Sequence, residues 1–285
     1  MIVLGGNRYG KAEVRLVRVD RGDPDAHSLK DLSVSVALSG ELAATHLTGD
    51  NSAVLTTDAQ KNTVFAFAAE HAVAAVEDFA LLLARHFVSS QEAITTARVS
   101  IDEYAWDRIS ATGHSFVRSG GETRGTTVTA HGDAHWVVSG LRDLVVLNTA
   151  GSEFWGFARD KYTTLAETTD RILATAVDAR WRYTEQVPWD DAYRQARDAL
   201  LTAFADTHSY SLQQTLYAMG KRVLETLPSV AEIRLSLPNK HHFDVDLARF
   251  GLENDRTVFY AADRPYGLIE GTVTRDDAEP AGEAW

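Results

Sequence analysis

The chain has 285 residues, of which 45% are hydrophobic and 24% are charged, a composition typical of a globular protein that can bury its own core. It contains no cysteine, which excludes disulfides, thiolate metal sites, iron–sulfur clusters and cysteine nucleophiles. With 28 Lys and Arg against 40 Asp and Glu, its net charge of -12 argues against nucleic-acid binding but not against a small anionic ligand.

Targeting signals are not evident in the sequence. No apolar run approaches the length of a membrane span, and residues 1–10 lack the apolar region of a signal peptide. The acidic C-terminal residues 276–285 do not end in the peroxisomal signal Ser-Lys-Leu. These observations predict a cytoplasmic protein that has no membrane or nucleic-acid partner.

The first half of the chain alternates apolar and polar residues, which is the period of a half-buried strand. This alternation predicts strands over residues 14–19, 32–38, 93–101, 126–131 and 136–147, with a turn over 21–25 between the first two. Val73, Val76, Phe79 and Leu83 recur at helical spacing, which predicts a helix over residues 70–87.

The second half repeats the order of strands, helices and strands. Its patterns predict a strand over 172–183, helices over 190–205 and 211–227, and strands over 233–237, 243–247, 257–261 and 268–273. Pro228 ends the second of these helices. The order predicts an α+β protein of two tandem domains, residues 1–140 and 141–285, the second ending in a flexible acidic tail.

Four short segments carry polar groups that secondary structure alone does not require. They are Arg8-Tyr9-Gly10-Lys11; Thr56-Thr57-Asp58-Ala59-Gln60-Lys61-Asn62-Thr63; Phe154-Trp155-Gly156-Phe157, with Arg159-Asp160 and Asp170-Arg171; and Leu237-Pro238-Asn239-Lys240-His241-His242-Phe243. In letters, spacing and order they resemble the signature segments of the urate oxidase (uricase) family. The resemblance runs from Tyr9 to Val273, and the four segments in order are far more specific than any one of them.

The resemblance implies a fold and a reaction. The fold would be two tandem tunnelling-fold (T-fold) domains, each an antiparallel sheet with helices on one face. Four chains would form a homotetrameric barrel around a central tunnel, with active sites at the subunit interfaces. The reaction would be the oxidation of urate by O2 and water to 5-hydroxyisourate and hydrogen peroxide in purine catabolism, with neither a metal nor an organic cofactor.

The resemblance also assigns residues that bind the substrate. Phe154 would stack on the purine face, and Arg171 would form a bidentate pair with its O2 and N3 edge, since a guanidinium fork matches a planar anion. Gln213 would hydrogen-bond the opposite edge of the ring. Leu212 would contribute a backbone N–H, so the valine that family members often carry there is a mild difference.

The resemblance assigns the chemical step to Lys11, Thr57 and His241, which would form a proton relay. A lysine acts as a base when its pKa is lowered, and a neighbouring imidazole can exchange the proton. Thr57, contributed by the adjacent chain, would pass the proton, and the next residue, Asp58, would offer its backbone N–H to the ligand. Asn239 would hold oxygen, peroxide or water above the ring.

Taken singly, these residues also fit structural roles. Phe154 fits a core aromatic, Arg171 a surface ion pair and Thr57 a turn or helix cap. The alternative function is a non-catalytic T-fold protein that binds purine or pterin, or a T-fold enzyme for another heterocycle.

Two histidine pairs raise the question of a metal site. His131 and His135 are separated by a turn, and His241 and His242 are adjacent, so in a strand they would point to opposite sides. Neither pair has the spacing of a known metal motif, and no metal site is predicted.

Overall fold

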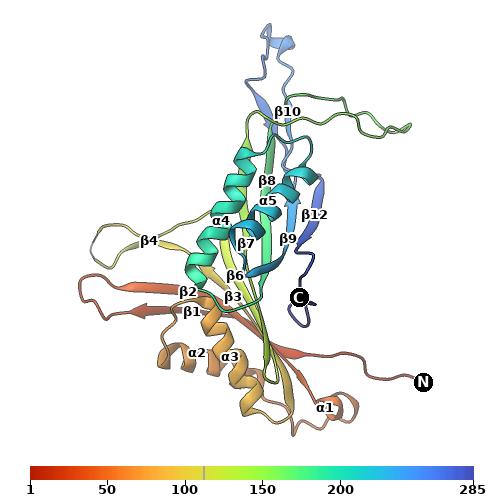
Figure 1. The fold of residues 1–285 in the computed structure, drawn as a ribbon. Coiled ribbons are helices and arrows are strands. Elements are labelled where there is room, and N and C mark those ends of the chain that lie inside the picture. The colour runs from red at the N-terminus through yellow and green to blue at the C-terminus, as the bar shows by residue number, and fades with distance from the viewer. Residues whose placement is uncertain (112) are drawn as a thin grey trace. The chain divides into compact units, whose positions relative to one another are not determined.

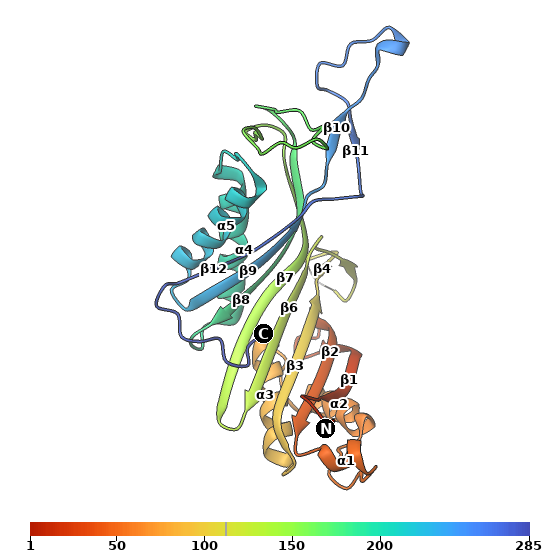
Figure 2. The ribbon, with the colours of Figure 1, turned by 90° about the vertical axis from the view of Figure 1, so that its right-hand side faces the viewer.

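The computed structural model describes residues 1–111 and 113–285. Internal contacts divide the chain into two compact units, each built on antiparallel strands and helices (Figures 1 and 2). Unit 1 holds residues 1–140, 182–190 and 279–285, and unit 2 holds residues 141–181 and 191–278. The last seven residues, which the sequence suggested would trail from the second half, therefore group with unit 1. There Arg98 donates to the carbonyls of Glu283 and Ala284.

Unit 1 is a sheet with helices packed against it. Its elements are β1 (Tyr9–Asp20), β2 (Ser28–Gly40), α1 (Ala43–Leu47), α2 (Thr57–Glu70), α3 (Val76–Ser90), β3 (Ile94–Tyr104), β4 (Trp106–Arg108), β5 (Phe116–Arg118), β6 (Thr123–His131) and the first half of β7 (Ala134–Asn148). The strand order is β1-β2-β3-β6-β7, while β4 and β5 form a separate hairpin. The pairs β1–β2, β2–β3 and β3–β6 are antiparallel.

The core of unit 1 lies between the sheet and α3. Leu32 and Leu38 of β2 and Ile101 of β3 are completely buried, as the alternation of these strands predicts. Helix α3 packs on β3 and β6 and buries Leu83 and Phe87 along one stripe. Helix α2 packs on β1.

Strand β1 approaches β2 unusually closely at Gly10. A Cβ atom at this position would lie 1.8 Å from the carbonyl oxygen of Val36, so only glycine fits. Just beyond it the register shifts between Lys11 and Val14, and Glu13 takes the left-handed conformation with φ 56°. A bulge of this kind redirects the side chains around it.

Unit 2 has the same layering. It holds the second half of β7, most of β8 (Leu173–Tyr183) and of α4 (Trp189–Asp206), then α5 (Leu212–Thr226), β9 (Val230–Pro238), β10 (His242–Asp244), the 3-10 turn η1 (Ala248–Phe250), β11 (Phe259–Ala261) and β12 (Leu268–Thr274). The strand order is β7-β8-β9-β12, with β9 and β12 antiparallel, and β10 and β11 form a separate hairpin. Helices α4 and α5 lie side by side on one face of these strands (Figures 1 and 2).

Helix α5 packs closely on β12 because a glycine stands at each of two contact points, Gly220 on the helix and Gly271 on the strand. A Cβ at Gly220 would lie 2.6 Å from the side chain of Val273, and one at Gly271 would lie 2.8 Å from that of Leu216. The close contact fixes the height of α5 above the sheet. Because the first turn of α5 carries Leu212 and Gln213, the same contact positions both residues.

Most predicted elements are confirmed, but the region before α3 differs. The predicted helix over 70–87 is confirmed from Val76, where α3 begins, whereas residues 71–75 link it to α2, which ends at Glu70. The Thr-Asp-x-Gln-Lys-Asn-Thr segment, expected ahead of the first helix, forms the start of α2. Helix α1, the β4–β5 hairpin and η1 were not predicted. In the described part of the chain no helix is long and apolar enough to cross a membrane.

Candidate active site

Unit 2 contains a pocket of about 430 Å³ that gathers residues from distant parts of the chain. Its walls come from the loop between β7 and β8, the first turn of α5, the end of β9, the β10–β11 hairpin and β12. Six of the predicted site residues line it: Phe154, Arg171, Leu212, Gln213, Asn239 and His241. Lys11, Thr57 and Asp58 belong to unit 1 and are not among the lining residues.

Arg171 is held firmly on the loop side of the pocket. Its backbone N–H donates to the Ser152 carbonyl at 2.9 Å, and its Nε donates to the Ser152 hydroxyl at 3.0 Å. The guanidinium carbon lies 5.1 Å from the centre of the Phe154 ring. Burial lowers the pKa of Arg171, which nevertheless stays charged because guanidinium is so strong a base. A partly desolvated cation of this kind suits a planar anion.

Phe154 is half-buried and borders the pocket, so it is not a plain core aromatic. Its backbone pairs with Thr168 in both directions, at 2.8 and 3.0 Å, which closes the loop that carries Arg171. The ring of Phe157 stacks on that of Phe154 at 5.0 Å. Phe154 thus brings an aromatic ring to the pocket beside the guanidinium of Arg171.

Leu212 and Gln213 open α5, opposite this loop. The Ser211 hydroxyl caps the helix by accepting from the Gln214 N–H at 3.1 Å. The first N–H groups of a helix have no partner within it and point outward, where they can meet a ligand. The Leu212 side chain is buried, as its apolar spacing predicts, whereas Gln213 is exposed to the pocket.

Asn239 and His241 follow β9. The Asn239 N–H donates to the Gly267 carbonyl at 2.8 Å, and the His241 carbonyl accepts from the Ala262 N–H at 2.9 Å. The imidazole of His241 stacks on Phe243 with centroids 5.7 Å apart. His242 also lines the pocket. The alternation expected of two neighbouring strand residues does not apply here, because β10 begins at His242 and His241 lies outside the strand.

Lys11, Thr57 and Asp58 form a second group, in unit 1. Thr56, not Thr57, caps α2 by accepting from the Ala59 N–H at 3.1 Å, which puts Thr57 and Asp58 in the exposed first turn. Lys11 is half-buried on β1, close enough for its charge to act on Asp58. The hydrogen bond from Lys61 holds the pKa of Asp58 below its usual value, and the charge of Lys11 adds to that effect.

A partly buried contact joins the strand of Lys11 to the start of α2. The Tyr9 hydroxyl donates to the Leu55 carbonyl at 3.0 Å. The completely buried Gln60 donates to the same carbonyl at 3.3 Å. Burial raises the pKa of Tyr9, which therefore stays protonated as a donor. The Tyr-Gly-Lys segment and the Thr-Asp segment are thus one local structure.

Sequence reasoning missed two supports of the pocket. Ser152 is completely buried behind Arg171. Arg256 lines the pocket and forms a 3.0 Å ion pair with Asp170, the residue before Arg171, from a backbone with φ 52°. Nothing in the sequence around Ser152 or Arg256 pointed to a site. The one signal in the sequence was Asp170, the ion-pair partner of Arg256, because it belongs to one of the four segments that resemble the uricase family.

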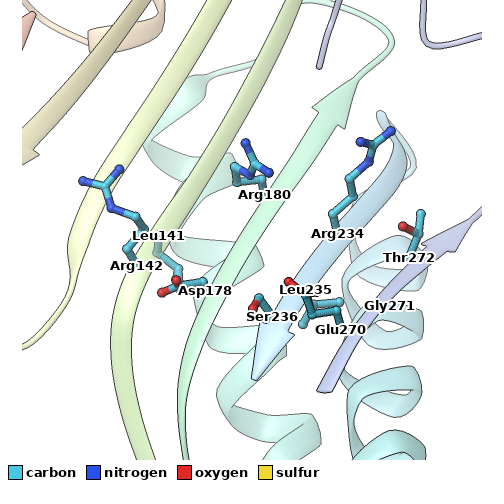
Figure 3. Close-up of a pocket in the computed structure, with 10 residues that line it drawn as sticks. All are labelled: Leu141, Arg142, Asp178, Arg180, Arg234, Leu235, Ser236, Glu270, Gly271 and Thr272. Atoms are coloured by element: carbon cyan, nitrogen blue, oxygen red, sulfur yellow. The ribbon is translucent and has the colours of Figure 1, made fainter. Parts of the chain in front are cut away.

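A larger pocket, of about 530 Å³, lies on the sheet face of unit 2 that is turned away from α4 and α5 (Figure 3). Arg142, Arg180 and Arg234 extend from neighbouring strands, beside Asp178 and Glu270. Carboxylates accompany the arginines in both pockets, but the lining of the larger one contains no aromatic ring. This chemistry suits a flat heterocycle less well than the smaller pocket does.

In the described residues, no group of three or more His, Asp or Glu side chains is arranged to hold a metal ion. His131 instead hydrogen-bonds Thr96 at 2.7 Å.

The fold and the smaller pocket together define a class of protein. An open antiparallel sheet with helices on it carries a pocket that offers an aromatic ring, a guanidinium and amide donors. This combination defines a class of α+β protein whose pocket offers the groups that a small, flat, anionic heterocycle requires.

Comparison with known proteins identifies the family. The sequence model of the uricase family matches residues 7–129 and 137–270. The uricase of Arthrobacter globiformis is 51% identical over 285 residues, which cover 100% of this chain and 94% of that protein, and the uricase of Dictyostelium discoideum is 42% identical, covering 96% and 98%. The crystal structure of the Arthrobacter globiformis uricase matches with a TM-score of 0.95 over 98% of this chain and 97% of that one. The chain belongs to the uricase family.

Proposed function

We propose that the smaller pocket of unit 2 is the urate-binding part of the active site. As a member of the uricase family, the chain is an oxidoreductase that oxidises urate in purine catabolism. The observation that carries the assignment of the site is the convergence of Phe154, Arg171 and Gln213 on one pocket from separate segments. A stacking ring, a cation and a polar amide are the groups that a flat purine anion requires.

In this proposal each wall of the pocket has a task. Phe154 stacks on the purine ring and Arg171 pairs with its O2 and N3 edge. Gln213 hydrogen-bonds the opposite edge, and Leu212 donates its backbone N–H. Support comes from the fixed backbone at both ends: Ser152 holds Arg171, and Ser211 caps the helix that carries Gln213.

The chemical step is assigned to Lys11, Thr57 and His241, with Asp58 and Asn239 assisting. Lys11, Thr57 and His241 relay the proton that urate loses, Asp58 offers its backbone N–H, and Asn239 holds oxygen or water over the ring. The support in unit 1 is that the hydrogen bond from Tyr9 to Leu55 joins the strand of Lys11 to the start of the helix that carries Thr57. The charge of Lys11 also acts on Asp58, next to Thr57 in the same turn.

The reaction needs neither a metal nor an organic cofactor in this proposal. Urate is an electron-rich anion, and further deprotonation makes electron transfer to O2 easier. The protein contributes positioning, charge stabilisation and removal of water. The products are 5-hydroxyisourate and hydrogen peroxide.

We further propose that four chains form a homotetrameric T-fold barrel with a central tunnel, and that residues 1–140 and 141–285 are its two T-fold domains. In unit 1 the outer strand is β1, and in unit 2 it is β12; sheet edges of this kind require pairing or cover. Thr57 and Asp58 of one chain would then complete the pocket of another. We place the enzyme in the cytoplasm, which activity assays of fractionated cells would test.

The decisive experiment is a urate assay on protein treated with a chelator. Loss of urate's ultraviolet absorbance with an equal yield of peroxide would support both the reaction and its independence from metals. If activity disappears and returns only with added metal, the cofactor-free chemistry is wrong. If neither treated nor untreated protein consumes urate, the assignment of the pocket is wrong.

A further inference from the structure

Three residues with buried hydroxyl groups lie close in sequence to residues that line the pocket. Ser152, Ser209 and Thr215 are each completely buried. The Thr215 hydroxyl donates to the Ser209 hydroxyl at 2.8 Å, and the Ser209 hydroxyl donates to the Ser211 carbonyl at 3.1 Å. Ser152 and Ser209 pair through their backbones in a parallel bridge. Buried hydroxyls need partners, and each of these three has one. The backbone bridge joins the segment that carries Arg171 to the one that leads into α5.

The Ser152 hydroxyl occupies one particular donor of Arg171. A guanidinium can present either its side edge, Nε with one Nη, or its terminal edge, Nη1 with Nη2, to a planar anion. Ser152 accepts from Nε at 3.0 Å, which takes up the side edge. The terminal edge is then the one left to face a ligand, with Phe154 stacked beside it.

The same segment fixes the distance to the opposite wall. The Glu153 N–H donates to the Ser209 carbonyl at 2.7 Å, and the Ser209 N–H donates to the Gly151 carbonyl at 2.9 Å. Ser209 lies two residues before Ser211, the cap of α5. Two backbone hydrogen bonds therefore join the loop that holds Arg171 to the segment just before the helix that carries Gln213.

We propose that Ser152 is a positioning residue whose hydroxyl directs the terminal edge of Arg171 toward urate, while the backbone bridge between Ser152 and Ser209 sets the spacing of Arg171 from Gln213. This inference rests on the proposed function of the pocket. Ser152 acts through Arg171 and does not touch the substrate. It therefore affects how tightly urate is held more than the proton and electron transfers that follow.

The test is Ser152→Ala, with urate affinity measured by calorimetry without oxygen, so that binding is separated from turnover. Loss of one charge-assisted hydrogen bond should raise the Kd and KM of urate about tenfold, with kcat changed by less than about threefold. Ser139→Ala is the matched control, since Ser139 is also completely buried and bonded to a charged group, Glu77 at 2.6 Å, but does not line the pocket. The control should leave the Kd unchanged even if it lowers stability.

A double-mutant cycle with Arg171→Lys shows whether Ser152 acts through the guanidinium. Lysine has no Nε–H, so Ser152→Ala should then add almost nothing to the Kd. Equal effects of Ser152→Ala in both backgrounds would overturn the proposal, as would an unchanged Kd in the single variant. If Ser152→Ala fails to fold, Ser152→Cys keeps the volume with a weak acceptor and should give the same rise in Kd. Wild-type protein that binds no urate would instead refute the proposed function itself.

Discussion

At the scale of single residues, Arg171 is the strongest candidate for recognition of the anion. Replacing it with lysine keeps the charge but removes the fork, so we expect the KM for urate to rise roughly tenfold, about 1.4 kcal/mol of binding free energy. Steady-state kinetics over a range of urate concentrations would measure it. Arg159→Lys, a change at an exposed arginine outside the pocket lining, is the control. An unchanged KM for Arg171→Lys would remove Arg171 as the anchor.

Lys11 is the residue whose loss should affect the chemistry alone. Lys11→Met keeps the length of the side chain but cannot carry a proton, so kcat should fall about 100-fold or more while the protein stays folded. Stopped assays for peroxide would measure kcat, and circular dichroism would show whether the protein stays folded. Lys61→Met tests a lysine that pairs with Asp58 in the first turns of α2 and should keep most of its turnover. Near-normal turnover of Lys11→Met would exclude Lys11 from the relay.

Sequence reasoning reached the residues that face the pocket but not those behind them. Phe154, Arg171 and His241 stand in recognisable segments, and the structure brings them to one pocket. Ser152 has no such signal, because its role depends on its hydrogen bond to Arg171, which only the structure shows. The same is true of Arg256, which reaches Asp170 from a loop far along the chain.

At the scale of elements, the contact between α5 and β12 leaves no room for added atoms. Gly220→Ala normally improves a helix by about 1 kcal/mol, but here the new methyl group would collide with Val273. We therefore expect a net loss of about 1–3 kcal/mol in the free energy of unfolding, measured by chemical denaturation. Lys221→Ala, on the exposed side of the same helix, should change it by less than about 0.5 kcal/mol. Equal changes in the free energy of unfolding for the two variants would mean that the contact between α5 and β12 can accommodate the added methyl group.

Elements with a clear period were predictable, and those without one were not. The strands with strict alternation and helices α4 and α5, with one apolar stripe each, appear where the sequence placed them. Helix α2 was missed because alanines and phenylalanines are spread around it and it buries only Gln60, Val64 and Ala68. The break before α3 was also missed, because Val73 is buried in the linker and continues the apolar spacing.

At the scale of the whole molecule, the order of strands and helices indicated an α+β protein, whereas the division into units depends on long-range contacts. Residues 182–190 and 279–285 join unit 1 although they are distant in sequence from the rest of it. No local pattern contains that information. The same limit applies to the assembly, since the sequence does not state which sheet edges meet.

The proposed assembly predicts that a single chain is inactive. The unit 2 pocket contains six of the nine predicted site residues, and two of the other three, Thr57 and Asp58, would come from a neighbouring chain. Dilution should therefore reduce the activity per chain as the tetramer dissociates. Light scattering combined with a urate assay at each concentration would measure both quantities. A monomer with full specific activity would contradict the proposal.

The contact at Gly10 has a consequence for interpreting genetic variation. In a mutational scan scored by activity alone, Gly10 would be grouped with its neighbour Lys11, and both would be counted as essential to catalysis. The two losses have different causes: a side chain at Gly10 would strike the Val36 carbonyl and prevent β1 from joining β2. Variants of Gly10 should thus be lost from the soluble fraction of the cell, whereas variants of Lys11 should accumulate as inactive protein. Scoring abundance beside activity would separate a defect of folding from a defect of chemistry at adjacent codons.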